Sequence, residues 1–209
     1  MKRSLSRGTT LIELAVASFL FLIVLGLTSS ALTAGIKNYL GVRGEIELQQ
    51  DAIVMLSRMA REMGEADPAA TWPPPVVESE LTPPPGQPVG VVFSSARDNQ
   101  GKLLLDFDSK QPIWQKRICY LFDPAQEKLL RSVDPLTVPT DSPPEVDLAK
   151  TTGWFREARP QDPMPGRVRS FTIKVGKDTD SFNLDIQVSG SSLGRTTTLQ
   201  FLGHSTMRG

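Results

Sequence analysis

Hydrophobic and polar positions follow three successive patterns along the chain, and the first is a nearly unbroken apolar run over 9–36. Its only charged residue is Glu13, so 14–36 holds 23 uncharged residues. As a helix these residues would rise about 34 Å, enough to cross a hydrocarbon core of about 30 Å. Residues 1–8 carry three cations and no acid. Because basic residues before an apolar span stay in the cytoplasm, the pattern predicts a transmembrane helix with the remainder on the far side.

Two other interpretations of this run are a buried core helix and a secretory signal peptide. The basic flank argues against a core helix, because it is typical of membrane spans. A signal peptide would use small residues such as Ser29 and Ala31 before its cleavage point. The run is long for a signal peptide, however, and it contains Glu13 close to its start. A carboxylate in apolar surroundings is costly unless it is neutralised, so Glu13 requires a specific partner.

The second pattern is helical and mixes charged with apolar residues, which predicts a continuation of the helix over 37–66 on the far side of the membrane. Gly64 and Pro68 mark its end. Steps of three and four residues define one apolar stripe. The stripe consists of Tyr39, Val42, Ile46, Gln49, Ile53, Leu56, Ala60 and Met63. It is either a coiled-coil seam or the face that docks on a globular domain, and Gln49 and Ala60 would make a weak seam, which favours docking.

The third pattern, over 67–209, consists of short β-like runs between turn signals, after a Pro-rich stretch at 68–88. We interpret the Pro-rich stretch as a surface loop, the alternatives being a disordered linker or a docking site for an aromatic groove. The expected strands are 89–94, 102–107, 114–122, 127–133, 168–175, 182–188 and 196–202. The third and fourth of these should form a hairpin and the last three an antiparallel meander.

Between the hairpin and the meander, 134–166 is rich in Pro and Asp and is expected to be irregular, with Trp154 and Phe155 anchoring it to the core. A helix followed by strands predicts an α+β fold. In it, the first half of the long N-terminal helix is transmembrane and the second half packs on an antiparallel β-sheet. The globular domain on the far side of the membrane would then span 67–209.

The sequence G-T-T-L-I-E at 8–13, after a short basic leader and before an apolar run, resembles the G-F-T-L-I-E signal of type IV prepilins and type II secretion pseudopilins. The resemblance implies that a prepilin peptidase cleaves between Gly8 and Thr9 on the cytoplasmic side. Thr9, which stands where the family most often has Phe, would become the first mature residue and the site of N-terminal methylation. Glu13 would be the fifth mature residue.

The resemblance also implies a role for Glu13 in subunit assembly, through pairing with the Thr9 amine of a neighbouring subunit. A buried pair adds little net stability, but an axial offset that leaves both charges unpaired is strongly disfavoured. Glu13 would therefore set the register between staggered helices. The simpler alternative is a glutamate that reaches toward the membrane interface.

A looser resemblance covers the hairpin and the late meander, which are similar to those of J-type and W-type minor subunits. It rests on strand rhythm and on the pattern of Tyr120, Leu129, Leu130 and Arg131. It implies a pilin-like fold and a place in a tip complex that primes filament assembly. Many major pilins close a C-terminal loop with a disulfide, which Cys119 cannot form alone, and this favours a minor subunit or a secretion pseudopilin.

Composition excludes several other classes of function. The 23 basic and 23 acidic side chains balance, which argues against a nucleic-acid-binding surface spread over the protein. Cys119 and His204 are the only residues of their kinds, so an internal disulfide, a four-cysteine zinc site and an HExxH site are excluded. We expect no catalytic residue, no metal, no cofactor and no small-molecule substrate, because the motifs for phosphate or dinucleotide binding and for a nucleophilic serine are missing.

One acidic loop is a candidate calcium site, since some pseudopilins bind calcium in this way. Its acids are Asp134, Asp141, Glu145 and Asp147. Their spacing is not that of an EF-hand, and we expect solvated loop charges instead.

Two hypotheses of different classes remain. In the first, the chain is a non-catalytic minor pilin or pseudopilin subunit of a type IV pilus or type II secretion filament, whose partners are other subunits, the prepilin peptidase and the inner membrane. In the second, it is a bitopic inner-membrane-anchored periplasmic protein that binds a ligand or acts as a sensor. Glu13 favours the first, because a mere anchor has no use for a carboxylate in its span.

Overall fold

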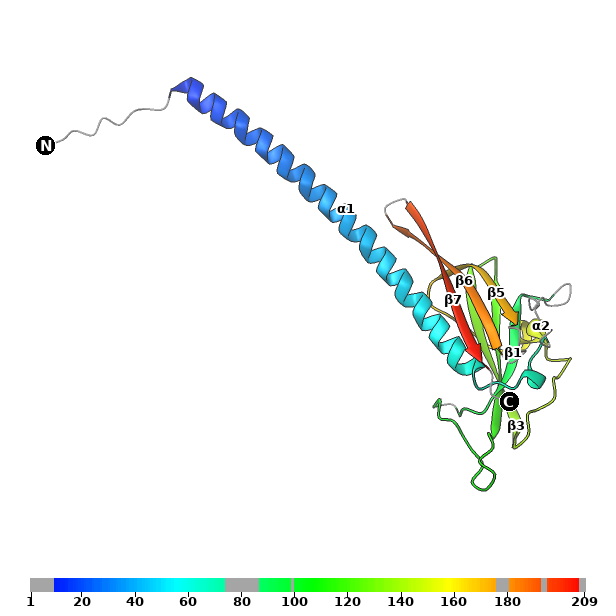
Figure 1. The fold of residues 1–209 in the computed structure, drawn as a ribbon. Helices are drawn as coiled ribbons and strands as arrows, with labels where there is room; N and C mark the ends of the chain where they lie inside the picture. The colour runs from blue at the N-terminus through cyan, green and yellow to red at the C-terminus, as the bar shows by residue number, and fades with distance from the viewer. Residues whose placement is uncertain (1–9, 74–86, 99, 176–180, 193–194, 207–209) are drawn as a thin grey trace. The chain divides into compact units, whose positions relative to one another are not determined.

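The computed structural model describes residues 10–73, 87–98, 100–175, 181–192 and 195–206 (Figure 1). These residues form the helices α1 (Leu11–Met63), η1 (Pro68–Ala70) and α2 (Thr152–Ala158). The strands are β1 (Gly90–Ser95), β2 (Trp114–Asp123), β3 (Lys128–Thr140), β4 (Gln161–Pro163), β5 (Arg167–Val175), β6 (Ser181–Ser192) and β7 (Arg195–Thr206). They pair into two antiparallel sheets, ordered β1-β2-β3-β4 and β5-β6-β7. A long apolar N-terminal helix followed by antiparallel sheets is the expected α+β class.

The leader at 1–8, with Gly8, and the predicted first mature residue Thr9 lie outside the described residues, as does 74–86 of the Pro-rich stretch. Contacts divide the chain between Gly44 and Glu45 into two units. In the first unit α1 is the described element, and its side chains over 10–40 are all exposed. The second unit contains the C-terminal part of α1 and both sheets.

Helix α1 continues through its glycines and ends at Met63, where the Gly64 N–H donates to the Ala60 carbonyl at 2.9 Å. Three hydroxyl groups within its apolar half are satisfied inside the helix. Those of Ser18, Thr28 and Thr33 each donate to the carbonyl four residues earlier, at 2.8 to 2.9 Å. Because these groups need no water, the segment suits apolar surroundings.

The face of α1 that packs on the domain is not the predicted stripe. Ile46 and Ile53 of that stripe are 47% and 59% exposed. The buried apolar residues of α1 are Leu48, Ala52, Met55, Met59 and Met63. This face is rotated by one residue, about 100°, from the predicted one, with which it shares Met63. Both sets of residues have helical spacing, so apolar spacing alone does not reveal which face packs on the domain. The observed face carries three methionines, whose flexible side chains adapt to the strands beneath them.

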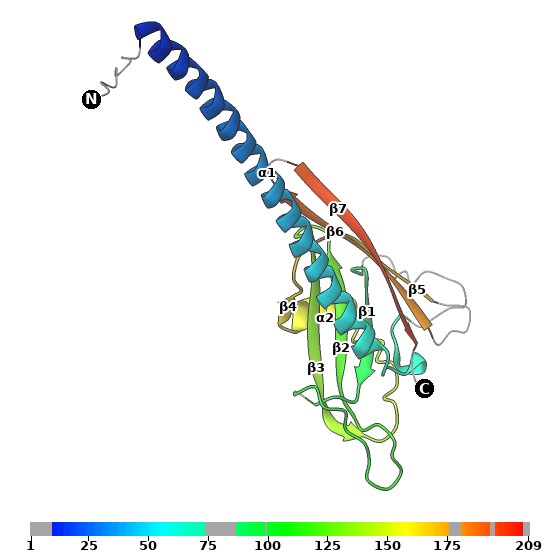
Figure 2. The same cartoon turned by 60° about the vertical axis from the view of Figure 1, so that its left-hand side comes forward.

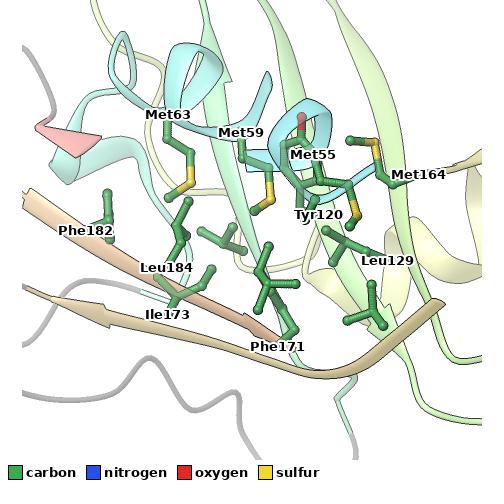
Figure 3. Packing of buried hydrophobic residues seen from close by; sticks show 14 of the residues in the cluster. Met55, Met59, Met63, Tyr120, Leu129, Met164, Phe171, Ile173, Phe182 and Leu184 are labelled. Carbon is green, nitrogen blue, oxygen red and sulfur yellow. The ribbon is translucent and has the colours of Figure 1, made fainter. Parts of the chain in front are cut away.

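The main core joins the C-terminal part of α1 to both sheets. Figure 2 shows that part of α1 lying across β1, β2 and β3. In Figure 3, Met55, Met59 and Met63 point toward side chains of β2, β3, β5 and β6. Since alternate residues of a strand face opposite sides, a second cluster forms on the other face of the four-stranded sheet. It contains Trp72, Val92, Cys119, Leu121, Leu130 and Phe155.

The predicted strands agree with the structure except at two places. Residues 102–107 form isolated bridges rather than a strand, from Leu103 to Arg97 and from Leu105 to Pro112. Leu103 and Leu105 are 36% and 48% exposed, so no sheet surface covers this apolar run. The prediction that 134–166 is irregular was wrong in part, because β3 extends to Thr140 and this region also contains α2 and β4.

The anchoring role predicted for Trp154 and Phe155 is confirmed. Phe155 is fully buried in the second cluster, and Trp154 packs against that cluster from α2. The final meander is also confirmed, as the separate sheet β5-β6-β7.

Candidate functional site

Glu13 has a partner within its own chain. The Thr10 backbone N–H donates to Glu13 Oε2 at 2.9 Å, and the Glu13 N–H donates to Thr10 Oγ1 at 3.3 Å. This reciprocal pair is a capping box, which satisfies two of the free N–H groups at the start of α1. Its sequence signature, Thr followed three residues later by Glu, is readable at Thr10 and Glu13. The sequence analysis did not predict this cap, because it assigned Glu13 a role through its charge and not through the helix start.

The apolar half of α1 is long and apolar enough to cross a membrane, as judged by length and composition. Its large side chains are exposed, with Leu11, Phe21 and Leu32 each more than 60% accessible. A continuous apolar surface of this kind requires a lipid or protein environment to cover it. This segment and the capping box that begins it are the part of the predicted assembly site that the structure describes.

A buried ionic network lies near the C-terminus of α1. Glu62 is 7% exposed and receives two hydrogen bonds from Arg131, from Nε at 3.1 Å and from Nη2 at 3.0 Å. The Tyr120 hydroxyl donates to the same carboxylate at 2.7 Å. Tyr120 and Arg131 are direct cross-strand partners in β2 and β3. These two residues of the hairpin pattern therefore both donate to Glu62.

The charges in this network shift one another's ionisation. Burial, assisted by the negative charge of Glu62, raises the pKa of the Tyr120 hydroxyl, which therefore stays protonated. Burial alone would lower the pKa of Arg131, but its hydrogen bonds and charge attraction to Glu62 outweigh burial and raise it. Tyr120 and Arg131 together satisfy both carboxylate oxygens of Glu62.

Beside this network a cleft of about 840 Å³ opens between the end of α1 and strands β1 to β3. We call it the cationic cleft, because five basic side chains line it. They are Arg58, Arg61, Arg97, Lys116 and Arg131. Its acidic side chains are Glu62 and Asp98, and Val54, Ile118 and Val133 supply apolar surface. Sequence reasoning missed the cleft because its cations come from segments far apart in the chain.

Lys116 is the most deeply placed cation of the cleft that pairs with no carboxylate among the described residues. It is 8% exposed, and its Nζ donates to the Asp98 carbonyl at 2.8 Å. Oδ1 of the Asp98 carboxylate accepts the backbone N–H groups of Gln100 and Lys102, at 2.8 and 2.9 Å. Burial, with the charge of Arg131 second, lowers the pKa of Lys116. An anion placed in the cleft would relieve this cost.

The expectation that the acidic loop carries only solvated charges was wrong for Asp134. This residue of β3 is 1% exposed and pairs with Lys150 at 2.7 Å and with Arg159. Arg117 lies 4.0 Å away. The Lys150 and Arg159 cations also lie over the Trp154 ring, at 5.1 and 5.4 Å from its centroid. This cluster holds α2 and the chain before it against β3.

Asp141 and Glu145 of the same loop are exposed. Over the described part of the chain, no three His, Cys, Asp or Glu side chains converge to hold a metal ion. His204 of β7 lies 3.0 Å from the Asn183 side chain of β6 through its Nδ1.

Cys119 is fully buried in β2, and burial raises the pKa of its thiol. A thiol in this environment is not an activated nucleophile.

No family model, curated protein or solved structure matches this chain. We therefore infer function from its residues.

Proposed function

We propose that this chain is a non-catalytic minor pilin or pseudopilin subunit of a type IV pilus or type II secretion filament. The observation that carries the proposal is the sequence G-T-T-L-I-E at 8–13, between a basic leader and a long apolar helix. The exposed apolar surface of that helix supports it, because a membrane or a filament core would cover this surface. The packing of the C-terminal part of α1 on antiparallel strands agrees with it.

In this proposal the chain enters the inner membrane with its N-terminus in the cytoplasm and its sheets in the periplasm. The prepilin peptidase then cleaves between Gly8 and Thr9, and methylation of the Thr9 amine follows. Removal of 1–8 leaves both capping groups of Thr10 in place. The mature subunit joins other subunits, and the looser resemblance to J-type and W-type subunits favours a tip complex that primes assembly.

The capping box is compatible with the proposed role of Glu13 in the filament. Only Oε2 accepts the Thr10 N–H among the described contacts, so Oε1 is available to the Thr9 amine of a neighbour. A carboxylate at the start of a helix is also favoured by the helix dipole, both before and after assembly. Glu13 would thus cap its own helix and set the axial register with the next subunit.

The second candidate is an anchored periplasmic protein that binds a ligand. The cationic cleft favours it, and the capping box gives Glu13 a use even in a simple anchor. The presence of Glu13 therefore does not by itself distinguish a filament subunit from an anchored protein. The negative charge of Glu13 does distinguish them, because the capping role needs only a hydrogen-bond acceptor.

Mass spectrometry of the membrane-extracted full chain tests processing. We expect the loss of residues 1–8. An intact N-terminus would support the anchor, and loss of about thirty residues would support a conventional signal peptide. Replacing Gly8 by Leu should reduce processing, which provides a control for peptidase dependence.

A pair of substitutions at Glu13 tests assembly. Glu13→Gln keeps a capping side chain and removes the charge, whereas Glu13→Ala removes both. We expect both variants to be cleaved normally and to be incorporated poorly, as measured by the amount of the subunit in sheared filaments or in cross-linked subunit complexes. Thr10→Ala, which weakens the cap and keeps the charge, should assemble better than either. Wild-type assembly by Glu13→Gln would overturn the register role.

A further inference from the structure

We propose that the cationic cleft binds an acidic peptide segment of a partner protein, whose carboxylates pair with Arg58, Arg61 and Lys116. This inference does not depend on leader processing or filament assembly, because every residue that lines the cleft belongs to the second unit. It assigns a binding role to a feature that the proposed subunit function leaves unused.

The cleft has more positive charge than its own acids neutralise. Arg131 is held by Glu62, and Arg97 is held by Glu65 through two hydrogen bonds, one of them 2.7 Å long. Asp98 binds backbone N–H groups of its own loop. Two of the five cations are therefore each held by two hydrogen bonds to a carboxylate within the chain.

The three remaining cations have donors to spare. The contact of Arg58 with Glu62 is a long one, 3.5 Å from Nε, and leaves its two Nη groups available. Arg61 pairs with no carboxylate among the described residues. Lys116 uses one of its three N–H groups on the Asp98 carbonyl. These donors converge on one cleft from α1 and β2.

The buried position of Lys116 distinguishes this cleft from an ordinary solvated basic surface. Arg58 and Arg61 alone are explained by the helix C-terminus, which favours cations in its last turns. A lysine residue that is 8% exposed is not explained in that way. Its neighbours Glu62, Tyr120 and Arg131 are fixed by mutual hydrogen bonds, so the wall beside it is rigid before any ligand arrives.

The lining favours an acidic peptide over a nucleic acid. Guanidinium and ammonium groups bind carboxylates and phosphates alike, so charge alone does not decide. Val54, Ile118 and Val133 add apolar surface suited to side-chain methylenes, and the described lining includes no aromatic side chain on which a base would stack. A volume of about 840 Å³ suits a segment of a few residues.

Binding of a synthetic peptide to the full chain in detergent micelles tests the inference. The probe is a fluorescein-labelled Glu-Val-Glu-Val-Glu pentapeptide, followed by anisotropy at low ionic strength, where charge pairing is strongest. A Gln-Val-Gln-Val-Gln peptide is the uncharged control, and a ten-nucleotide oligothymidylate tests the nucleic-acid alternative. We expect only the acidic peptide to bind appreciably.

Substitutions in the cleft locate the site. We expect Arg61→Gln and Lys116→Met each to weaken binding by about tenfold or more, the value of a lost hydrogen bond between charged groups. Arg156→Gln, which changes an exposed arginine of α2 outside the cleft, should bind as the wild type does. Arg61 is exposed, so its variant tests the site even if Lys116→Met folds poorly. Wild-type affinity of a folded Arg61→Gln variant, equal binding of the uncharged peptide, or tighter binding of the oligothymidylate would each overturn the proposal.

Discussion

Glu62 of α1 and Arg131 of β3 share two hydrogen bonds, of 3.0 and 3.1 Å, across a sequence separation of 69 residues. This buried pair joins the C-terminal part of α1 to the four-stranded sheet and lines the cationic cleft. Glu62 also accepts from Tyr120, so it connects one helix to two adjacent strands. The network therefore belongs both to the packing of α1 and to the wall of the proposed binding site.

Replacing Glu62 by Ala should destabilise the domain strongly. The substitution leaves the Arg131 charge and the Tyr120 hydroxyl buried without their acceptor, at an expected cost of about 3–5 kcal/mol in the free energy of unfolding. The measurement is denaturant unfolding of the full chain in detergent micelles. A Glu62→Met, Arg131→Met double variant is the control, since it removes both charges and should cost much less than Glu62→Ala. A loss below about 0.5 kcal/mol for Glu62→Ala would show that the pair is not structural.

Two residues of α1 test which of its faces packs on the domain. Met59 is fully buried, whereas Ile53, in the stripe that the sequence suggested, is 59% exposed. Met59→Ala should lower the free energy of unfolding by about 2–5 kcal/mol, because it opens a cavity in the core. Ile53→Ala should change it by about 0.5 kcal/mol or less. The two variants are compared by thermal unfolding, and a reversed order would mean that the helix face is assigned incorrectly.

The ion cluster around Asp134 should hold the segment before α2 in place. Asp134→Asn removes a buried negative charge shared by Lys150 and Arg159, and we expect a loss of about 1.5–3 kcal/mol in stability. Limited proteolysis should then cut near Lys150 faster than in the wild type. Asp141→Asn, an exposed change in the same loop, is the control. Equal cleavage rates for the two variants would contradict a structural role for Asp134.

Stability should fall at alkaline pH because of Cys119. Burial raises the pKa of the folded thiol, so the folded chain keeps a proton that the unfolded chain releases above about pH 8.5. The unfolded state then binds fewer protons, and the free energy of unfolding falls by up to about 1.4 kcal/mol per pH unit.

The difference between wild type and Cys119→Ala isolates this effect, because Lys116 and Tyr120 are common to both chains and cancel. Thermal unfolding is measured from pH 7 to pH 10. The wild type should lose stability relative to the variant only above about pH 8.5. A difference that stays constant with pH would exclude a buried, protonated thiol.

Local pattern was enough to predict much of this protein. An apolar run behind a basic leader predicts the N-terminal helix, and alternation between turn signals predicts β1, β2, β3 and the final meander. Each of these features depends on residues a few positions apart, whose spacing along a helix or strand places them on one face. The capping box of Thr10 and Glu13 is equally local and was available to sequence reading, although it was missed.

Tertiary structure alone decided which surfaces meet. Two faces of α1 have helical apolar spacing, and only the shape of the strands beneath selects the one with Met55 and Met59. The apolar run at 102–107 forms isolated bridges rather than a strand. Asp134 is buried where Lys150 and Arg159, which lie on either side of α2, pair with it on β3. The cationic cleft gathers Arg61, Arg97 and Lys116 from three segments. Charge pairing and packing depend on distances in space, which the order of residues along the chain does not determine.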